Sequence, residues 1–182
     1  DDDDDDDDDE DDDDDEDEDY DEEDDQEQQS DENLHDYYYI DHLNKTTEVY
    51  PYIIDTLDFL RSKNVPMAVV SNKRHPFTID SVDKFFKEYI EIAIGSGKQF
   101  PLKPDPTSSH HVLKRFNAKP ELSYFVGDTE YDIKTAHNAG MISLGVLWGM
   151  SDKDKLESFN PDYLFEDPKS MLGFFEENLQ HI

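Results

Sequence analysis

Five polar residues of the sequence have types and surroundings that suit phosphate chemistry: Ser71, Asn72, Lys103, Asp128 and Asp132. Ser71-Asn72 directly follows the apolar run Met67–Val70. A small hydroxyl and the next backbone N–H, where a strand gives way to a helix, can cradle phosphate oxygens. A serine that only caps the following helix would produce the same pattern.

Lys103 lies within Phe100-Pro-Leu-Lys-Pro-Asp105, between prolines and just ahead of an expected helix. Because proline restricts the backbone, we expect this lysine to be held in place. A positioned ammonium group could neutralise the charge on a phosphoryl group and on the carboxylate that attacks it. The alternative is an ordinary surface lysine in a loop.

Asp128 and Asp132 lie at the start of an expected helix, in the segment Gly127-Asp-Thr-Glu-Tyr-Asp132. Residues four apart lie on one face of a helix. Mg²⁺ prefers one or two carboxylates together with waters and phosphate oxygens, so the pair suits magnesium. The alternative is that Asp128 caps the helix while Asp132 is solvated. The strand, glycine and paired aspartates, with Ala136, Ala139 and Gly140 downstream, favour the metal site.

The elements that must position these residues alternate between strands and helices. We expect strands at 67–70, 92–94, 124–126, 142–146 and 162–165. We expect helices at 51–60, 77–89, 106–116, 130–139 and from 168, and the end of another at 36–47. Gly140 should end its helix. This alternation predicts an α/β fold with a parallel sheet, whose site lies at the carboxyl ends of the strands.

Composition separates the chain into two parts and excludes several classes of protein. The formal net charge is −33, and residues 1–32 hold 27 of the 49 acidic residues but no Lys or Arg. Such charge argues against binding to nucleic acid. No apolar run approaches the length of a membrane span, the N-terminus resembles no targeting peptide, and there is no cysteine. We therefore expect a cytoplasmic protein without a membrane segment.

Apart from Tyr20, the acidic run has no apolar residue to bury, so we expect residues 1–33 to be disordered. It is interpreted as a low-complexity linker or insertion. A weak cation binder and a contact for basic partners are the functional alternatives. The run has no glycine and no calcium-loop spacing, so no function is inferred from it.

Taken in order, the motifs resemble the haloacid dehalogenase superfamily of hydrolases, in particular its phosphoglycolate phosphatase-like group. Three stretches resemble the second, third and fourth motifs of the superfamily: Val69–Lys73, Phe100–Pro106, and Val126–Asp132 with Ala136–Gly140. Residues 145–149 match the stretch that follows. Tyr38–Asn44 with Tyr50-Pro51 resembles the end of a helical cap. This group usually has glycine where Tyr52 follows Pro51.

The resemblance implies a three-layer Rossmann-like core and a role for each candidate residue. Ser71, aided by Asn72, would bind the phosphoryl oxygens, and Lys103 would stabilise a phosphoryl-aspartate. Asp128 would bind Mg²⁺, and Asp132 would be a second metal-site carboxylate that holds Lys103 or a metal-bound water. The implied domains are an acidic segment at 1–33, a cap end at 34–50 and a core at 51–182.

The first motif of the superfamily, an apolar strand ending in Asp-x-Asp-Gly-Thr, is absent from the sequence. Tyr37–Asp41 imitates such a strand, but the residues after it supply neither the second aspartate nor the glycine. The resemblance implies the sheet order 5-4-1-2-3, in which this strand is central. We therefore expect the chain to be the C-terminal part of a longer protein, whose missing segment or a protein partner completes the sheet.

Two functions follow from this reading. The first is a Mg²⁺-dependent phosphatase of a small phosphorylated metabolite, acting through an aspartyl-phosphate whose nucleophile is not in this chain. The second is a non-catalytic remnant that acts in binding. Phosphomutase or dehalogenase chemistry is a weaker third alternative, and Asp128 argues against dehalogenation because that reaction needs no Mg²⁺.

Overall fold

The structure, a computed structural model, describes residues 47–97 and 99–180. All of them lie in one unit, Asn44–Ile182. The expectations for residues 1–33 and for the cap end at 34–46 lie outside the described residues, and residues 47–50 form neither helix nor strand.

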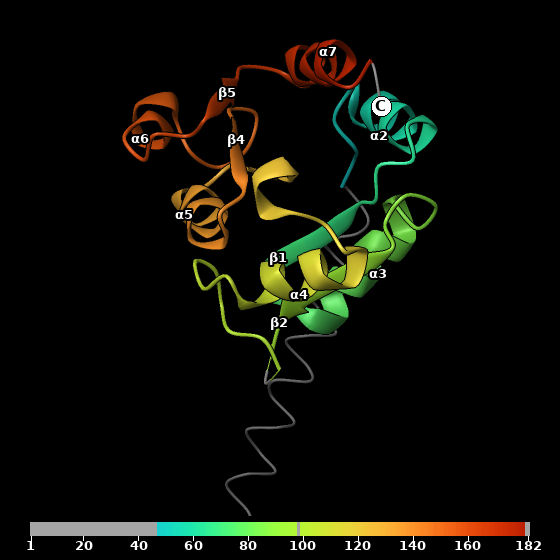
Figure 1. The fold of residues 1–182 in the computed structure, drawn as a ribbon, viewed down its shortest axis with the longest axis vertical. Coiled ribbons are helices and arrows are strands. Elements are labelled where there is room, and N and C mark those ends of the chain that lie inside the picture. Colours follow the sequence, from blue (N-terminus) through green and yellow to red (C-terminus); the bar gives the residue numbers. More distant parts are fainter. Residues whose placement is uncertain (1–46, 98, 181–182) are drawn as a thin grey trace, which may run out of the picture. The chain divides into compact units, whose positions relative to one another are not determined.

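Strands and helices alternate along the described chain, which confirms the α/β class (Figure 1). The strands are β1 (Ala68–Arg74), β2 (Ile92–Ser96), β3 (Tyr124–Gly127), β4 (Ile142–Val146) and β5 (Tyr163–Phe165). The helices are α2 (Ile53–Ser62), α3 (His75–Phe85), α4 (Thr107–Phe116), α5 (Glu130–Ala139), α6 (Lys153–Glu157) and α7 (Pro168–Asn178), with a 3₁₀ turn at Pro120–Leu122. None of the helices in this part of the chain has the length and apolar run needed to cross a bilayer.

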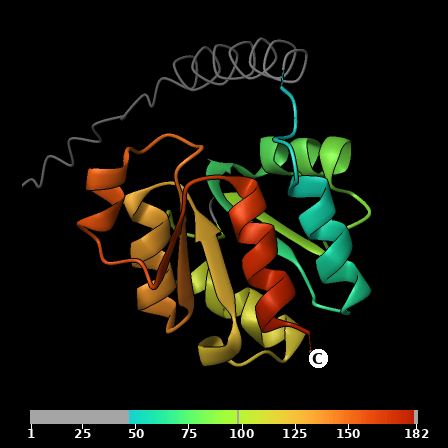
Figure 2. The same cartoon turned by 90° about the horizontal axis from the view of Figure 1, so that it is seen from above.

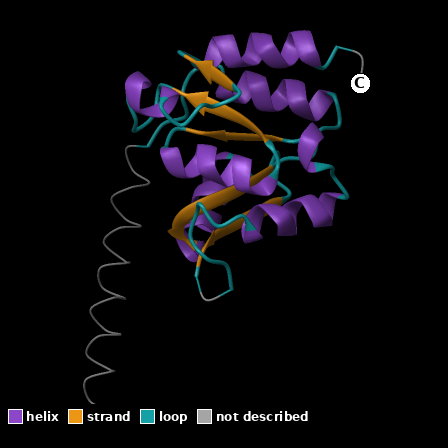
Figure 3. Cartoon of the chain, turned by 60° about the vertical axis from the view of Figure 1, so that its left-hand side comes forward, coloured by secondary structure: helices purple, strands orange, loops and turns teal. Residues whose placement is uncertain are grey.

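The strands form two parallel sheets, β1-β2 and β3-β4-β5 (Figure 3). Within the described residues, β1 and β3 each pair on one side only. This arrangement is the one expected of a parallel sheet that lacks its central first strand. Within the described residues, no strand pairs with the second edge of β1 or of β3, and such an edge can accept a further strand.

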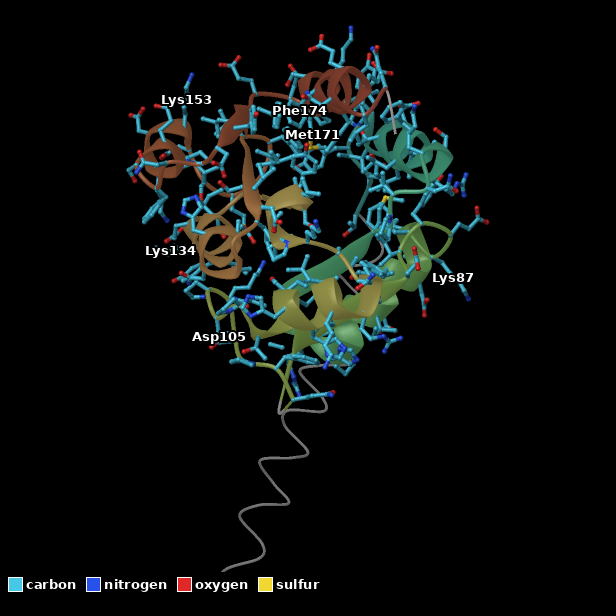
Figure 4. The ribbon with its side chains drawn as sticks, in the orientation of Figure 1. Lys87, Asp105, Lys134, Lys153, Met171 and Phe174 are labelled. Atoms are coloured by element: carbon cyan, nitrogen blue, oxygen red, sulfur yellow. The ribbon has the colours of Figure 1, made fainter. Side chains whose placement is uncertain are left out.

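Helices cover the β3-β4-β5 sheet on both faces. Strand β4 lies between α7 on one side and α5 on the other (Figures 1 and 2). Met171 and Phe174 of α7 point inward, whereas Lys134 of α5 and Lys153 of α6 lie at the periphery (Figure 4). The core on the α7 side joins this helix to α2 and the strands through Leu60, Leu144, Val146, Phe165, Met171, Phe175 and Leu179.

Most expected elements are present, with corrections at their ends. The strand predicted to end at Val70 continues to Arg74, and the helix predicted to reach Tyr89 ends at Phe85 because residues 86–90 close into a turn. Helix α6 was not expected, since its five residues are too short to show a period.

Helix α2 begins two residues later than expected because Tyr52 adopts a left-handed conformation. Its φ is 64°, and its carbonyl accepts the backbone N–H of Thr56 at 3.0 Å and the hydroxyl of Thr56 at 2.7 Å. Glycine adopts this conformation without steric cost, whereas a bulky side chain is strained in it. The tyrosine that departs from the glycine of the phosphoglycolate phosphatase-like group therefore occupies a position that favours glycine.

Candidate active site

The candidate residues lie where parallel strands end. Ser71 and Asn72 follow Val70, where the regular pairing of β1 with β2 ends, and Asp128 directly follows β3. Lys103 lies in the loop between β2 and α4, and Asp132 lies in the first turn of α5. Open α/β sheets place their sites at this carboxyl edge.

Ser71 lies in an irregular stretch of β1. The register with β2 shifts between Val70, which pairs with Ile94, and Arg74, which pairs with Ser96. Between these two pairs β1 advances by four residues while β2 advances by two, as in a β-bulge. Bulges often change the direction of side chains beside active sites. The backbone N–H of Lys73 donates to Ser71 Oγ at 3.1 Å, so the hydroxyl hydrogen of Ser71 remains available as a donor.

Asn72 is paired with the main chain of Lys103. The Asn72 Oδ1 atom accepts the backbone N–H of Lys103 at 2.7 Å, and Asn72 Nδ2 donates to the carbonyl oxygen of Lys103 at 3.2 Å. Both polar atoms of this amide side chain are thus engaged by the loop that carries the lysine.

The side chain of Lys103 is held by a buried carboxylate. Its Nζ lies 2.6 Å from Asp132 Oδ1, and the two side chains are 14% and 6% exposed. The same ammonium group lies 5.8 Å from the centre of the Phe125 ring of β3, within the range of a cation–π contact. The lysine is therefore positioned by charge and by packing, and the surface-loop alternative does not describe it.

Asp132 uses its second oxygen to begin helix α5. Asp132 Oδ2 accepts the backbone N–H of Thr129 at 2.9 Å and the hydroxyl of Thr129 at 2.7 Å. Thr129, not Asp128, is the N-cap residue, and it forms a capping box with Asp132. Gly127 makes room for this carboxylate, because a Cβ at position 127 would overlap it.

Asp128 is oriented by the loop that follows β4. The backbone N–H of Met150 donates to Asp128 Oδ2 at 2.7 Å. A Cβ at Gly149 would overlap the same carboxylate. No described residue donates a hydrogen bond to Asp128 Oδ1, so one oxygen of the half-buried carboxylate is available to a ligand.

These donors fit magnesium only in part. In the described part of the chain, no three histidine or acidic side chains come together as a metal cluster. Mg²⁺ is commonly held by one or two carboxylates, with waters and substrate phosphate oxygens completing the shell. Asp128, with one oxygen oriented and one available, suits that coordination. Asp132 has both oxygens engaged by Lys103 and Thr129.

The structure therefore joins Asn72, Lys103 and Asp132 by direct contacts and places Ser71 and Asp128 at the same edge. Sequence reasoning did not identify Thr129, Gly149 and Met150 as part of this arrangement. The spacing Thr129-x-x-Asp132 matches the capping-box pattern and could have revealed the first of them. Nothing in the local sequence indicates the contact between Asp128 and the peptide N–H of Met150.

Most of the chain matches the model of a known protein family. Residues 14–146 match the model described as haloacid dehalogenase-like hydrolase. The chain is 31% identical over 133 residues to the pyrophosphatase PpaX of Oceanobacillus iheyensis, covering 72% of the chain and 62% of that relative. It is 30% identical over 140 residues to the phosphoglycolate phosphatase of Haemophilus influenzae, covering 76% of the chain and 62% of that relative.

A solved structure agrees with these relatives. The crystal structure of a predicted phosphoglycolate phosphatase from Haemophilus somnus superimposes with a TM-score of 0.69 at 28% identity, covering 76% of this chain and 62% of the other. The chain thus spans about three fifths of the length of the relatives that it matches.

Proposed function

The chain belongs to the haloacid dehalogenase-like hydrolase family, and on that premise we propose that it forms the phosphate-handling part of a phosphatase for a small phosphorylated metabolite, similar to phosphoglycolate phosphatase. The observation that carries the proposal is the buried contact between Lys103 Nζ and Asp132 Oδ1 at the carboxyl edge of the strands. A fixed cation at this edge suits the charge that develops on a transferring phosphoryl group.

Each residue has a role in this proposal. The Ser71 hydroxyl donates to a phosphoryl oxygen, and the Lys103 ammonium neutralises the charge on the phosphoryl group. Asp132 holds Lys103, and Asp128 offers its available oxygen to Mg²⁺. When bound, the metal would neutralise further negative charge on the phosphate.

The proposed nucleophile is a carboxylate on a strand that pairs between β1 and β3. Its oxygen attacks phosphorus while the ester P–O bond breaks, and the leaving oxygen takes a proton from an acid group. Water then hydrolyses the acyl phosphate, which releases inorganic phosphate and restores the carboxylate. Two features support a nucleophile that lies on a further strand. One edge of β1 and one edge of β3 are unpaired within the described residues, and the chain contains no Asp-x-Asp-Gly-Thr motif.

The test is release of phosphate from 2-phosphoglycolate, with Mg²⁺ and with EDTA, by two preparations. One is this chain alone, and the other is the longest natural polypeptide that contains it. We expect Mg²⁺-dependent release from the longer polypeptide and none from the chain alone. Equal release from both would place the nucleophile inside the chain. No release from the longer polypeptide with any of a panel of small phosphate monoesters would overturn the phosphatase proposal.

The second candidate is a non-catalytic remnant that binds a protein partner through the same edges. The observation that favours it is Val126 of β3, which is 42% exposed although valine usually lies inside. We propose a cytoplasmic setting for either function. With a net charge of −33, neither function involves nucleic acid or a membrane surface.

The test of the non-catalytic candidate is binding. Absence of phosphate release, together with stoichiometric capture of a strand-forming segment, would favour it.

A further inference from the structure

We propose that Asn72 is a positioning residue, which acts on phosphate chemistry by fixing the backbone of Lys103. The inference rests on the proposed function. Asn72 and Lys103 are 31 residues apart, and the Asn72 amide makes two hydrogen bonds to the Lys103 main chain, at 2.7 and 3.2 Å. Such a pair holds the two peptide groups on either side of the Lys103 Cα, which a single bond would not do.

The Lys103 loop is also held from the other sheet. Asn138 of α5 donates from Nδ2 to the carbonyl oxygen of Pro104 at 2.9 Å, and Asp132 of the same helix binds the ammonium group. Helix α5 packs on β3 and β4, whereas Asn72 belongs to β1. The loop is therefore anchored to both sheets, and the ammonium position depends on both anchors.

This side-chain role adds to the prediction from sequence, in which Asn72 aids Ser71 in binding phosphoryl oxygens. The Asn72 oxygen accepts the N–H of Lys103, and one of the two N–H donors of its NH₂ group is directed at the Lys103 carbonyl. A side chain so occupied can act on the reaction through the lysine. The backbone N–H of Asn72 is unaffected by this pairing and can still face a phosphoryl oxygen.

The first test measures the reactivity of the Lys103 amine and does not depend on activity. Wild type and the Asn72→Ala variant are treated briefly with acetic anhydride, and acetylation at Lys103 is followed by mass spectrometry. With the anchor removed, the ammonium group should leave Asp132 more often, and we expect labelling to rise about tenfold, the usual worth of a hydrogen bond. The control is Asn178→Ala, which removes a similar bond from Asn178 Nδ2 to the carbonyl of Phe174, far from the site in sequence. Labelling that rises no more than in the control would overturn the proposal.

The second test is a double-mutant cycle in the preparation that releases phosphate. Asn72→Ala should lower kcat on the order of 100-fold with little change in KM, because misplacing a catalytic group by about 1 Å has that effect. In a Lys103→Met background, Asn72→Ala should cause no further loss. A direct contact with substrate would instead raise KM and would persist without the lysine.

A variant with a side chain of the same size separates the anchoring role from damage to β1. Asn72→Asp retains an acceptor for the Lys103 N–H but places a carboxylate oxygen against the Lys103 carbonyl. It should label faster than wild type and slower than Asn72→Ala. If no preparation releases phosphate, the proposed function fails while the labelling result still decides the anchoring role. If phosphate is released and Asn72→Ala has the wild-type labelling rate and kcat, the anchoring role is wrong while the proposed function stands.

Discussion

Gly149 lies against the carboxylate of Asp128, so closely that any side chain at position 149 would occupy the space of that carboxylate. The next residue donates its N–H to Asp128 Oδ2. Together they fix one oxygen of the aspartate and leave the other available. The residue at position 149 thus controls the orientation of a carboxylate 21 positions earlier in the chain.

Replacing Gly149 with alanine should displace Asp128 and weaken magnesium binding. We expect the Mg²⁺ concentration for half-maximal phosphate release to rise about 10- to 100-fold, the usual effect of disturbing a group that orients a metal ligand. The Mg²⁺-dependent rise in melting temperature should shrink in parallel. The matched control is Gly173→Ala within α7, where an added Cβ meets nothing within 4 Å. A Gly149→Ala protein with unchanged magnesium dependence would contradict this account.

Removing the charge at position 103 should slow catalysis sharply. Lys103→Met should lower kcat about 100- to 1000-fold, the usual cost of losing one group that stabilises transition-state charge. The control is Lys153→Met, whose side chain is 52% exposed and forms surface ion pairs with Glu157 and Glu166. Rates of phosphate release and circular dichroism of both variants give the comparison. Loss of activity in the control as well would point to a general effect of lysine removal.

The backbone at Tyr52 predicts a stabilising substitution. Tyr52→Gly should raise the free energy of unfolding by about 1 kcal/mol, because glycine adopts the left-handed conformation without the steric cost of a Cβ. Lost contacts of the ring work against this gain, including the ammonium group of Lys169 at 5.9 Å from its centre. Urea denaturation of both proteins provides the measurement. A Tyr52→Gly variant less stable than wild type would mean that ring contacts outweigh backbone strain.

The stability of the β4–β5 pair should depend on acid pH through Asp162. The backbone N–H of Ser143 and then its hydroxyl donate to Asp162 Oδ2, at 2.8 and 2.7 Å, and lower the pKa of this carboxyl, with a further contribution from His137. A lowered folded-state pKa stabilises the fold at pH values above the ordinary aspartate value of about 4, and this stabilisation is lost as the pH falls through the folded-state pKa.

Asp162→Asn should therefore lower the free energy of unfolding by roughly 1 kcal/mol at pH 7, a modest value because the carboxylate is solvent-exposed. The difference from wild type should shrink steadily below pH 4. Urea titrations between pH 7 and pH 2.5 provide the measurement. A difference that stays constant over this range would show that the carboxylate does not contribute through its charge.

Local patterns were sufficient to predict much of the fold. The bounds of α5 and β4 agree with the sequence prediction because each has a local signal: a glycine stop at Gly140 for the helix, and apolar residues at alternate positions 142, 144 and 146 for the strand. Gly140 adopts a φ of 70°, as such a stop requires. The division of the strands into β1-β2 and β3-β4-β5 agrees with the sheet order that the family resemblance implies, because the absent first motif would lie on the central strand.

The contacts of the candidate site could be predicted only in part. The family resemblance implies that Asp132 holds either Lys103 or a metal-bound water, and the structure shows the contact with Lys103. The pairing of Asn72 with the Lys103 backbone, and of Asp128 with the N–H of Met150, depends on loops that meet across 31 and 22 residues. Neither hydrophobic periodicity nor motif spacing predicts these hydrogen bonds, because the main-chain groups that they involve are the same at every position.

The separation of the strands into two sheets also bears on how the molecule folds. Residues 68–96 form one contiguous β-α-β unit and residues 124–146 form another, and each closes its strand pair within its own stretch of chain. Contacts of short sequence separation form fastest, so we expect two cooperative units with separate hydrogen-exchange protection. The Lys103 loop lies between them in sequence and bonds to both. The Lys103 ammonium group would therefore reach its place last, after both units have folded.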